Sequence, residues 1–87
     1  MDKTEAISVL RDVLAECAGS ILPRCVLLEP ASPQTLENAG RYEVHLACMV
    51  DDDLRRCIGI VVSKHQLSMR QDGNRVILYR DHEKDAF

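Results

Sequence analysis

The pattern of apolar and polar positions is clearest in residues 41–50. Apolar side chains occupy every second position there, and polar side chains such as Glu43 and His45 lie between them. Alternation with a period of two is typical of a strand that buries one face. The polar side becomes apolar at Ala47 and Met49, which indicates that a helix or another molecule covers this end of the strand. The buried side comprises Tyr42, Val44, Leu46, Cys48 and Val50.

Residues 51–65 fit two interpretations. The run from Ile58 to Val62 is β-branched around Gly59, which lowers helix propensity and suits a buried strand. A helix is favoured because Asp51 or Asp52 provides an N-terminal cap, and because Lys64 and His65 place cations in the last turn. The apolar spacing agrees with a helical stripe. That stripe comprises Leu54, Cys57, Ile58, Val61, Val62 and His65.

Residues 67–80 are predicted to form a hairpin around Asp72-Gly73-Asn74. Both Asp-Gly and Gly-Asn tolerate the positive φ angles of tight hairpin turns. A two-residue loop turns Leu67, Met69, Val76 and Leu78 to the inner face. A three-residue loop turns Ile77 and Tyr79 inward instead, and the sequence leaves both possibilities open.

The N-terminal half predicts one helix, one strand and a linker. Asp2 followed by Glu5 has the form of a capping box at the start of a helix over 2–18, and Gly19 ends that helix. Arg24–Glu29 is a short strand between prolines. Residues 30–40 form either a loop or one to two helical turns within 34–39. The buried stripe of the first helix comprises Ile7, Leu10, Val13, Leu14 and Cys17.

This order of elements predicts a small single α+β domain over residues 1–80. Two helices pack on a mostly antiparallel four-stranded sheet, in the order α-β-β-α-β-β. If residues 52–65 form a strand, the fold becomes one helix followed by a five-stranded meander. The charged tail 81–87 is expected to fray.

Length and composition narrow the function classes. With 87 residues, a net charge of −3 and 3% aromatic residues, the chain closes one aliphatic core and lacks a large catalytic cleft or base-stacking surface. It shows neither a signal peptide nor a membrane-spanning segment, so we expect a cytoplasmic protein without a membrane partner. The four cysteines form no CxxC pair, as expected for buried thiols in a reducing compartment.

No motif in the chain predicts catalysis, a metal site or a cofactor. The soft ligands nearest in sequence do not form the close pairs typical of zinc sites. The run Asp51–Asp53 lacks the alternating oxygen ligands and the distal glutamate of a calcium loop, and is better explained as a helix cap. We therefore expect neither an enzyme nor a cofactor. The soft ligands concerned are His45, Cys48, Cys57 and His65.

The basic character of the C-terminal hairpin supports an alternative function. Between residues 64 and 80, four cations accompany the single acid Asp72, so a two-stranded ribbon could contact nucleic-acid phosphates. Charges on an exposed hairpin also prevent edge pairing, and we favour that explanation. A third hypothesis is a metal- or thiol-dependent sensor. The cations of the nucleic-acid alternative are Lys64, Arg70, Arg75 and Arg80.

The leading hypothesis is a small non-enzymatic protein-interaction or regulatory domain that associates with itself, as a homodimer, or with a protein partner. The chain has more apolar positions than two helices can cover, and contact with a partner would shelter the remainder. The predicted interface residues are Ala47, Met49, Ile60, Ile77 and Tyr79.

Overall fold

The computed structural model describes residues 1–31 and 40–80, which form two helices and a four-stranded sheet. In chain order the elements are helix α1 (Lys3–Glu16), the 3₁₀ turn η1 (Pro23–Cys25), strands β1 (Val26–Pro30) and β2 (Tyr42–Leu46), helix α2 (Asp52–His65), and strands β3 (Ser68–Asp72) and β4 (Arg75–Tyr79).

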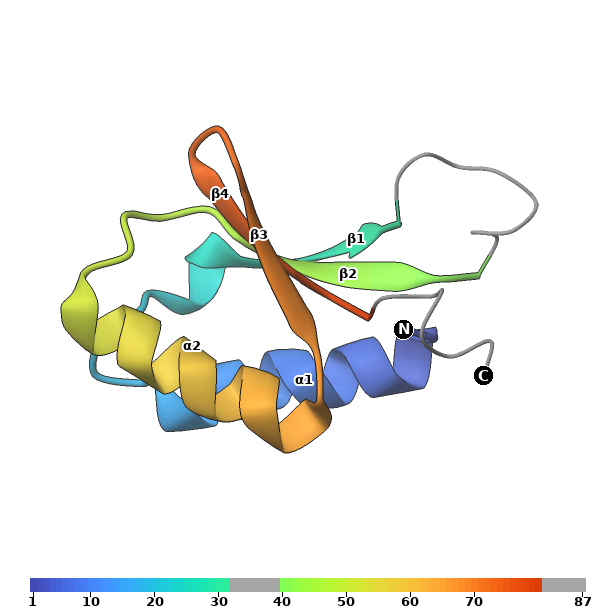
Figure 1. The fold of residues 1–87 in the computed structure, drawn as a ribbon, viewed down its shortest axis with the longest axis horizontal. Helices are drawn as coiled ribbons and strands as arrows, with labels where there is room; N and C mark the ends of the chain where they lie inside the picture. Colours follow the sequence, from blue (N-terminus) through green and yellow to red (C-terminus); the bar gives the residue numbers. More distant parts are fainter. Residues whose placement is uncertain (32–39, 81–87) are drawn as a thin grey trace.

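The sheet has the strand order β1-β2-β4-β3, and every neighbouring pair is antiparallel. Both helices lie on one face of the sheet, as Figure 1 shows. The predicted α+β class and element order are confirmed, and the five-stranded meander is excluded because residues 52–65 are helical. Helix α2 connects β2 to β3, which run in the same direction with β4 between them.

Helix α1 begins as predicted, because the Asp2 carboxylate accepts a hydrogen bond from the Glu5 amide at 2.7 Å. The reciprocal half of a capping box is replaced, since the Glu5 carboxylate binds Arg80 instead. The predicted stripe is partly correct. Its members Val13 and Cys17 are fully buried, whereas the positions of deepest burial nearer the start of the helix are Ala6 and Val9.

Helix α2 confirms the helical interpretation of residues 52–65. The Asp51 carboxylate accepts a hydrogen bond from the Leu54 amide at 2.8 Å, and the helix ends where Gln66 takes a left-handed conformation with φ 55°. The β-branched run is accommodated because every turn still places an apolar side chain against the sheet. Three side chains are completely buried: Leu54, Ile58 and Val61.

The hairpin uses Gly73-Asn74 as a two-residue loop, and Asp72 pairs with Arg75. Gly73 has φ +60° at the first loop position, where type II′ turns favour glycine. This register turns Val76 and Leu78 to the helix-covered face, as predicted for a two-residue loop. Ile77 and Tyr79 consequently lie on the opposite face of the sheet.

Two predicted strand boundaries are wrong. The strand expected over 41–50 ends at Leu46, and residues 47–50 form a connection to α2. The strand expected from Arg24 begins at Val26, because Pro23 starts a 3₁₀ turn that suits its fixed φ. The predicted helical turns within 34–39 and the predicted frayed tail 81–87 lie outside the described residues.

The core between the helices and the sheet is aliphatic, and it contains residues from the sheet and from both helices. Leu46 of β2 and Leu78 of β4 are completely buried beside Ile58 of α2. Met1 also enters the core, and its carbonyl accepts a hydrogen bond from the Tyr42 amide at 2.6 Å. Within residues 1–31 and 40–80, no helix is long and apolar enough to span a bilayer.

Candidate functional site

A groove of about 560 Å³ lies between the connection 47–50, the first turns of α2 and the turn end of the β3–β4 hairpin. A smaller cavity of about 120 Å³ adjoins it and shares Val50, Arg55, Gln71 and Val76 with it. The lining of both mixes apolar side chains with arginine and amide groups. We refer to the two together as the Met49 groove.

The groove exists because β2 ends before its neighbour does. The pairing of β2 with β4 ends at Leu46 and Val76, whereas the hairpin continues to its turn at Gly73. The Ala47 amide still donates to the Cys25 carbonyl at 2.8 Å, and the chain then leaves the sheet to begin α2. This divergence opens the space between the connection and the hairpin.

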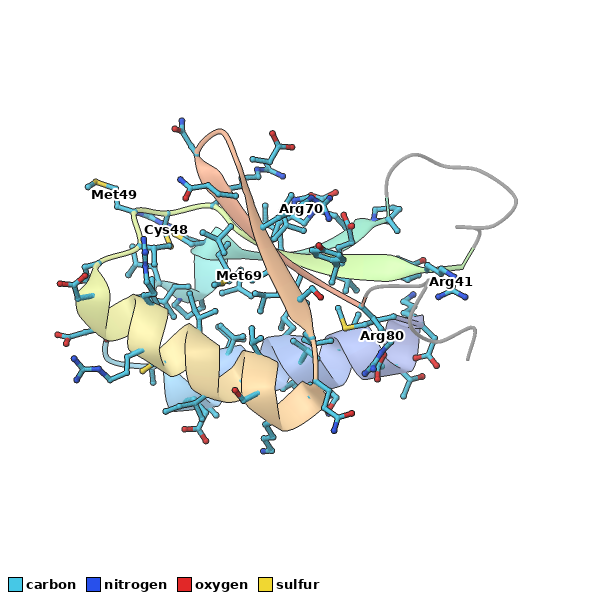
Figure 2. All side chains as sticks on the ribbon, viewed as in Figure 1. Arg41, Cys48, Met49, Met69, Arg70 and Arg80 are labelled. Atoms are coloured by element: carbon cyan, nitrogen blue, oxygen red, sulfur yellow. The ribbon has the colours of Figure 1, made fainter. Side chains whose placement is uncertain are left out.

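Met49 projects from the groove with 95% of its surface exposed, and Figure 2 shows its side chain pointing away from the body of the molecule. The groove is lined by three arginines, Arg55, Arg70 and Arg75. No aspartate or glutamate is among the described residues that line it. Because the whole chain is acidic, this concentration of positive charge is local. The groove therefore combines an exposed apolar side chain with a cationic wall, in which Arg70 and Arg75 have carboxylate partners and Arg55 has no ion pair with a described residue.

The five predicted interface residues lie in three separate places. Ala47 and Met49 line the Met49 groove. Ile60 is 53% exposed on the outer side of α2, away from the core. Ile77 and Tyr79 lie on the sheet face opposite the helices, where Ile77 is only 2% exposed. The structure thus brings four of the five together as two separate pairs and leaves Ile60 apart from both.

A polar cluster covers the sheet face opposite the helices. The carboxylate of Glu43, a residue only 5% exposed, accepts a hydrogen bond from Arg70 and contacts the Nε2 atom of His45, both at 3.2 Å. The Nη1 atom of Arg75 lies 3.2 Å from His45 Nδ1 and 3.9 Å from the Glu29 carboxylate. Because arginine only donates, Nδ1 is the acceptor and Nε2 carries the proton that Glu43 accepts.

The Arg70 side chain lies across part of this sheet face and contacts Glu43 and Tyr79. Arg70 lies on the edge strand β3, and its carboxylate partner lies two strands away on β2, so the side chain crosses β4. Its guanidinium carbon lies 4.7 Å from the centroid of the Tyr79 ring, which is within the range of a cation–π contact. Sequence reasoning missed Glu43 because alternation alone makes it a solvated residue.

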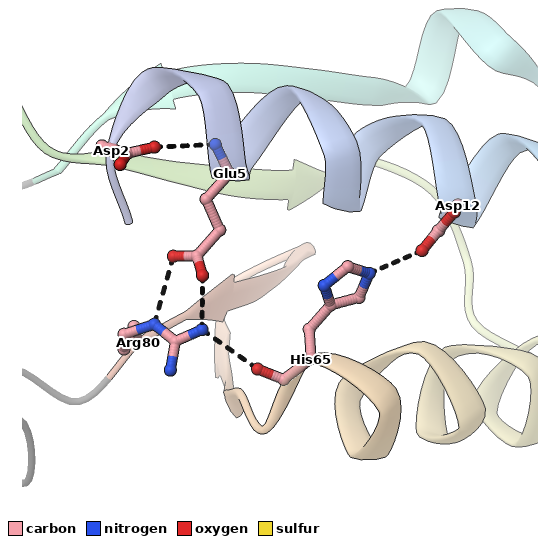
Figure 3. A network of polar contacts seen from close by, with 5 residues as sticks. All are labelled: Asp2, Glu5, Asp12, His65 and Arg80. Carbon is pink, nitrogen blue, oxygen red and sulfur yellow. Dashed lines mark hydrogen bonds and ion pairs between the residues drawn. The ribbon is translucent and has the colours of Figure 1, made fainter.

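A second polar network joins both helices to the end of β4, as Figure 3 shows. The Asp12 carboxylate of α1 lies 2.5 Å from His65 Nε2 and 3.3 Å from Lys64 Nζ, both on α2. Arg80 donates to the Glu5 carboxylate at 2.6 and 3.1 Å and to the His65 carbonyl at 3.1 Å. These contacts fix α1 against α2, which indicates a structural role.

The cations predicted to bind nucleic acid are distributed over several surfaces, and each has a carboxylate partner. Lys64 pairs with Asp12, and Arg80 with Glu5, beside the two helices. Arg70 and Arg75 lie on the opposite sheet face, where they pair with Glu43 and Glu29. Their positive charge is therefore largely neutralised within the chain.

The contact between Asp12 and His65 predicts a loss of stability in acid. The hydrogen bond from His65, followed by that from Lys64, holds the pKa of the Asp12 carboxyl below its ordinary value of 3.8. A lowered native pKa stabilises the fold above the unfolded pKa, and this stabilisation is lost as the pH falls through the native value. Thermal unfolding between about pH 5 and about pH 2 should therefore show a smaller decline for Asp12→Asn than for the unaltered protein.

Glu16→Gln is the control for this measurement, because Glu16 is an exposed acid on the same helix. It leaves the contact between Asp12 and His65 intact and should retain the full decline. Equal declines in the Asp12→Asn variant and the unaltered protein would show that the contact contributes nothing to folding.

The four cysteines are free thiols and form two pairs in space. The Cys57 thiol donates a hydrogen bond to the Glu16 carbonyl at 3.5 Å, and it lies close enough to the Cys17 thiol to influence the pKa of Cys17. Burial first, and then contact with Cys57, raises the pKa of Cys17 to about 12. Cys48 lies close to Cys25 in the same way, and burial is the main cause of the raised pKa of Cys48.

The four soft ligands noted in the sequence, His45, Cys48, Cys57 and His65, do not come together as a metal site. Cys48 and Cys57 belong to different thiol pairs, while His45 and His65 hydrogen-bond to carboxylates in separate networks. Across the described ranges, no three His, Cys, Asp or Glu side chains are placed to hold a metal ion together.

Comparisons of the chain with protein-family models, with curated proteins and with solved structures found no match.

Proposed function

We propose that this chain is a small non-enzymatic protein-interaction domain that binds a second copy of itself through the Met49 groove. The observation that carries the proposal is the 95% exposure of Met49 at a groove with apolar and cationic walls. A methionine side chain gains about 1.5–3 kcal/mol when it is fully buried, and its flexibility suits contact surfaces.

The distribution of charge around the groove supports a second copy as the partner. An isologous dimer places the same patch of both subunits face to face, so the patch must complement itself. The groove has a cationic wall, and directly after its Val50 come three exposed aspartates, Asp51–Asp53. A two-fold axis near Met49 would set the aspartates of each copy against the arginines of the other.

Arg55 is the arginine best suited to such a contact. It lines both parts of the groove, and it forms no ion pair with any other described residue. Arg75, by comparison, is already engaged by Glu29 and His45. An acidic side chain from a partner would therefore gain more binding free energy by pairing with Arg55 than with Arg75.

Further features support a binding role over catalysis or nucleic-acid contact. Both ring nitrogens of His45 are held by neighbouring side chains, so this imidazole has no free nitrogen to act as a general base. The carboxylate partners of the hairpin cations leave little charge for phosphates. We also propose a cytoplasmic location, because close thiol pairs stay reduced in that compartment.

Substitution of Met49 by glutamate is expected to abolish the dimer. In an isologous interface the change occurs twice, so the dissociation constant should rise at least about a hundredfold. Light scattering on the purified protein across a concentration series would measure it. Ile60→Glu is the matched control, because it adds the same charge to an exposed apolar residue of α2 outside the groove. A strict monomer at every concentration would overturn the proposal.

A charge exchange tests the arrangement within the dimer. Arg55→Glu and Asp52→Arg should each weaken association, because each sets like charges against one another across the interface. The double variant restores opposite charges between the two copies and should recover much of the affinity. If both single variants dimerise normally, the two-fold arrangement described above is wrong.

A further inference from the structure

Cys25 and Cys48 are held together by the end of the sheet. The antiparallel register pairs Val26 with Leu46, and the next bond along is donated by the Ala47 amide to the Cys25 carbonyl at 2.8 Å. This bond sets the backbone of Cys25 against that of Ala47, so Cys48 is the next residue along the chain from the partner of Cys25. Burial raises the pKa of Cys48, and its thiol lies close enough to that of Cys25 for this neighbour to raise the pKa further.

The second pair provides a comparison within the same chain. Cys17 is almost completely buried in the core, and only Cys57 of that pair is partly exposed. Cys25 and Cys48 are both partly exposed, and Cys48 lines the Met49 groove. A reagent from solvent therefore reaches the pair formed by Cys25 and Cys48 more readily.

We propose that Cys25 and Cys48 form a dithiol site that small disulfides of the glutathione type oxidise to an intramolecular disulfide. The placement of both thiols beside the last bond of the β1–β2 ladder carries this inference. It does not depend on the dimer proposed above.

The reaction is a thiol–disulfide exchange in two steps. The thiolate of one cysteine attacks the small disulfide, forms a mixed disulfide and releases one small thiol. The thiolate of the second cysteine then attacks the protein sulfur of that mixed disulfide and releases the other small thiol. The two protons of the cysteines end on the released thiols, so the protein is oxidised by two electrons and the small disulfide is reduced.

The product ties the connection 47–50 to η1. In the reduced protein, the hydrogen bond from the Ala47 amide to the Cys25 carbonyl holds this connection to η1. A disulfide adds a covalent link beside Met49. Such a link restricts the unfolded chain and thereby stabilises the fold. In a reducing compartment the bond would be transient, as expected of a thiol that responds to redox conditions.

Mass spectrometry after incubation of the native, fully reduced protein with oxidised glutathione tests the proposal. We expect a product two hydrogen atoms lighter, with peptide mapping that joins Cys25 to Cys48. It should form at least about ten times as fast as any bond between Cys17 and Cys57, because the thiolate of the buried Cys17 is scarcer. The oxidised protein should also melt at a higher temperature than the reduced one.

Two matched variants complete the test. Cys48→Ser should stop at a mixed disulfide on Cys25, whereas Cys57→Ser should oxidise like the unaltered protein. Cys25→Ser provides the reciprocal check if Cys48→Ser does not fold. Mixed disulfides alone in the unaltered protein, a bond between other cysteines, or a lower melting temperature after oxidation would each overturn the proposal.

Discussion

Replacement of Leu46 by alanine is expected to destabilise the domain by about 2–5 kcal/mol. Leu46 is completely buried at the end of the inner strand β2, where it pairs with Val26 on one side and Val76 on the other. Removal of its side chain loses buried apolar area and leaves a cavity between sheet and helices. In a chain of this size, each kcal/mol lowers the melting temperature by about 4–8 °C.

Met69→Ala is the matched control for this experiment. Met69 pairs with Leu78 and lies on the same sheet face, but the edge strand β3 leaves it exposed. Its truncation should change the free energy of unfolding by less than about 1 kcal/mol. Chemical denaturation of both variants would measure the difference, and equal losses would show that the complete burial of Leu46 adds nothing to its contribution.

The helices could be predicted from sequence because several independent signals coincide there. In residues 52–65 the cap at Asp51, the apolar stripe and the cations of the last turn all indicated a helix, and they outweighed a β-branched run that favoured a strand. The hairpin was recognised from its turn residues. Only its register decided that Ile77 and Tyr79 lie opposite the helices, because local pattern could not separate a two-residue loop from a three-residue loop.

The Met49 groove could not be predicted, because it depends on where neighbouring strands end. Alternation of apolar and polar residues continues past Leu46, although the chain leaves the sheet there to begin α2. Ala47 and Met49 stand out in the sequence as apolar residues on the polar side of the predicted strand. This pattern indicated a contact surface at this end of the strand. Arg55 carried no such signal, since its place in the groove comes from packing between α2 and the hairpin.

Neutralisation of Glu43 by substitution with glutamine is expected to destabilise the fold by about 1–3 kcal/mol. The change keeps the shape of the side chain but removes the charge that Arg70 and His45 contact. The loss stays below that of a wholly buried ion pair, because the Arg70 side chain is 39% exposed and water partly compensates it. Urea denaturation at neutral pH would measure the effect.

Glu29→Gln is the appropriate comparison, because Glu29 lies on the same sheet face and pairs with Arg75 at 3.9 Å where both side chains are well exposed. An exposed pair of this kind contributes about 0–1 kcal/mol, so the Glu29 variant should remain close to the unaltered protein. Equal losses from the two variants would mean that the burial of Glu43 has no energetic consequence.

A double substitution separates the strength of the pair from the penalty of leaving one partner alone. If Arg70 depends on Glu43, Arg70→Met should cost less in the Glu43→Gln background than in the unaltered protein, because the cation has already lost its carboxylate. Apolar replacement of both partners can even restore stability, since a hydrophobic pair avoids the desolvation of two charges. Recovery of this kind would indicate that the cluster is kept to cover Ile77 and keep the outer sheet face polar, at some expense of stability.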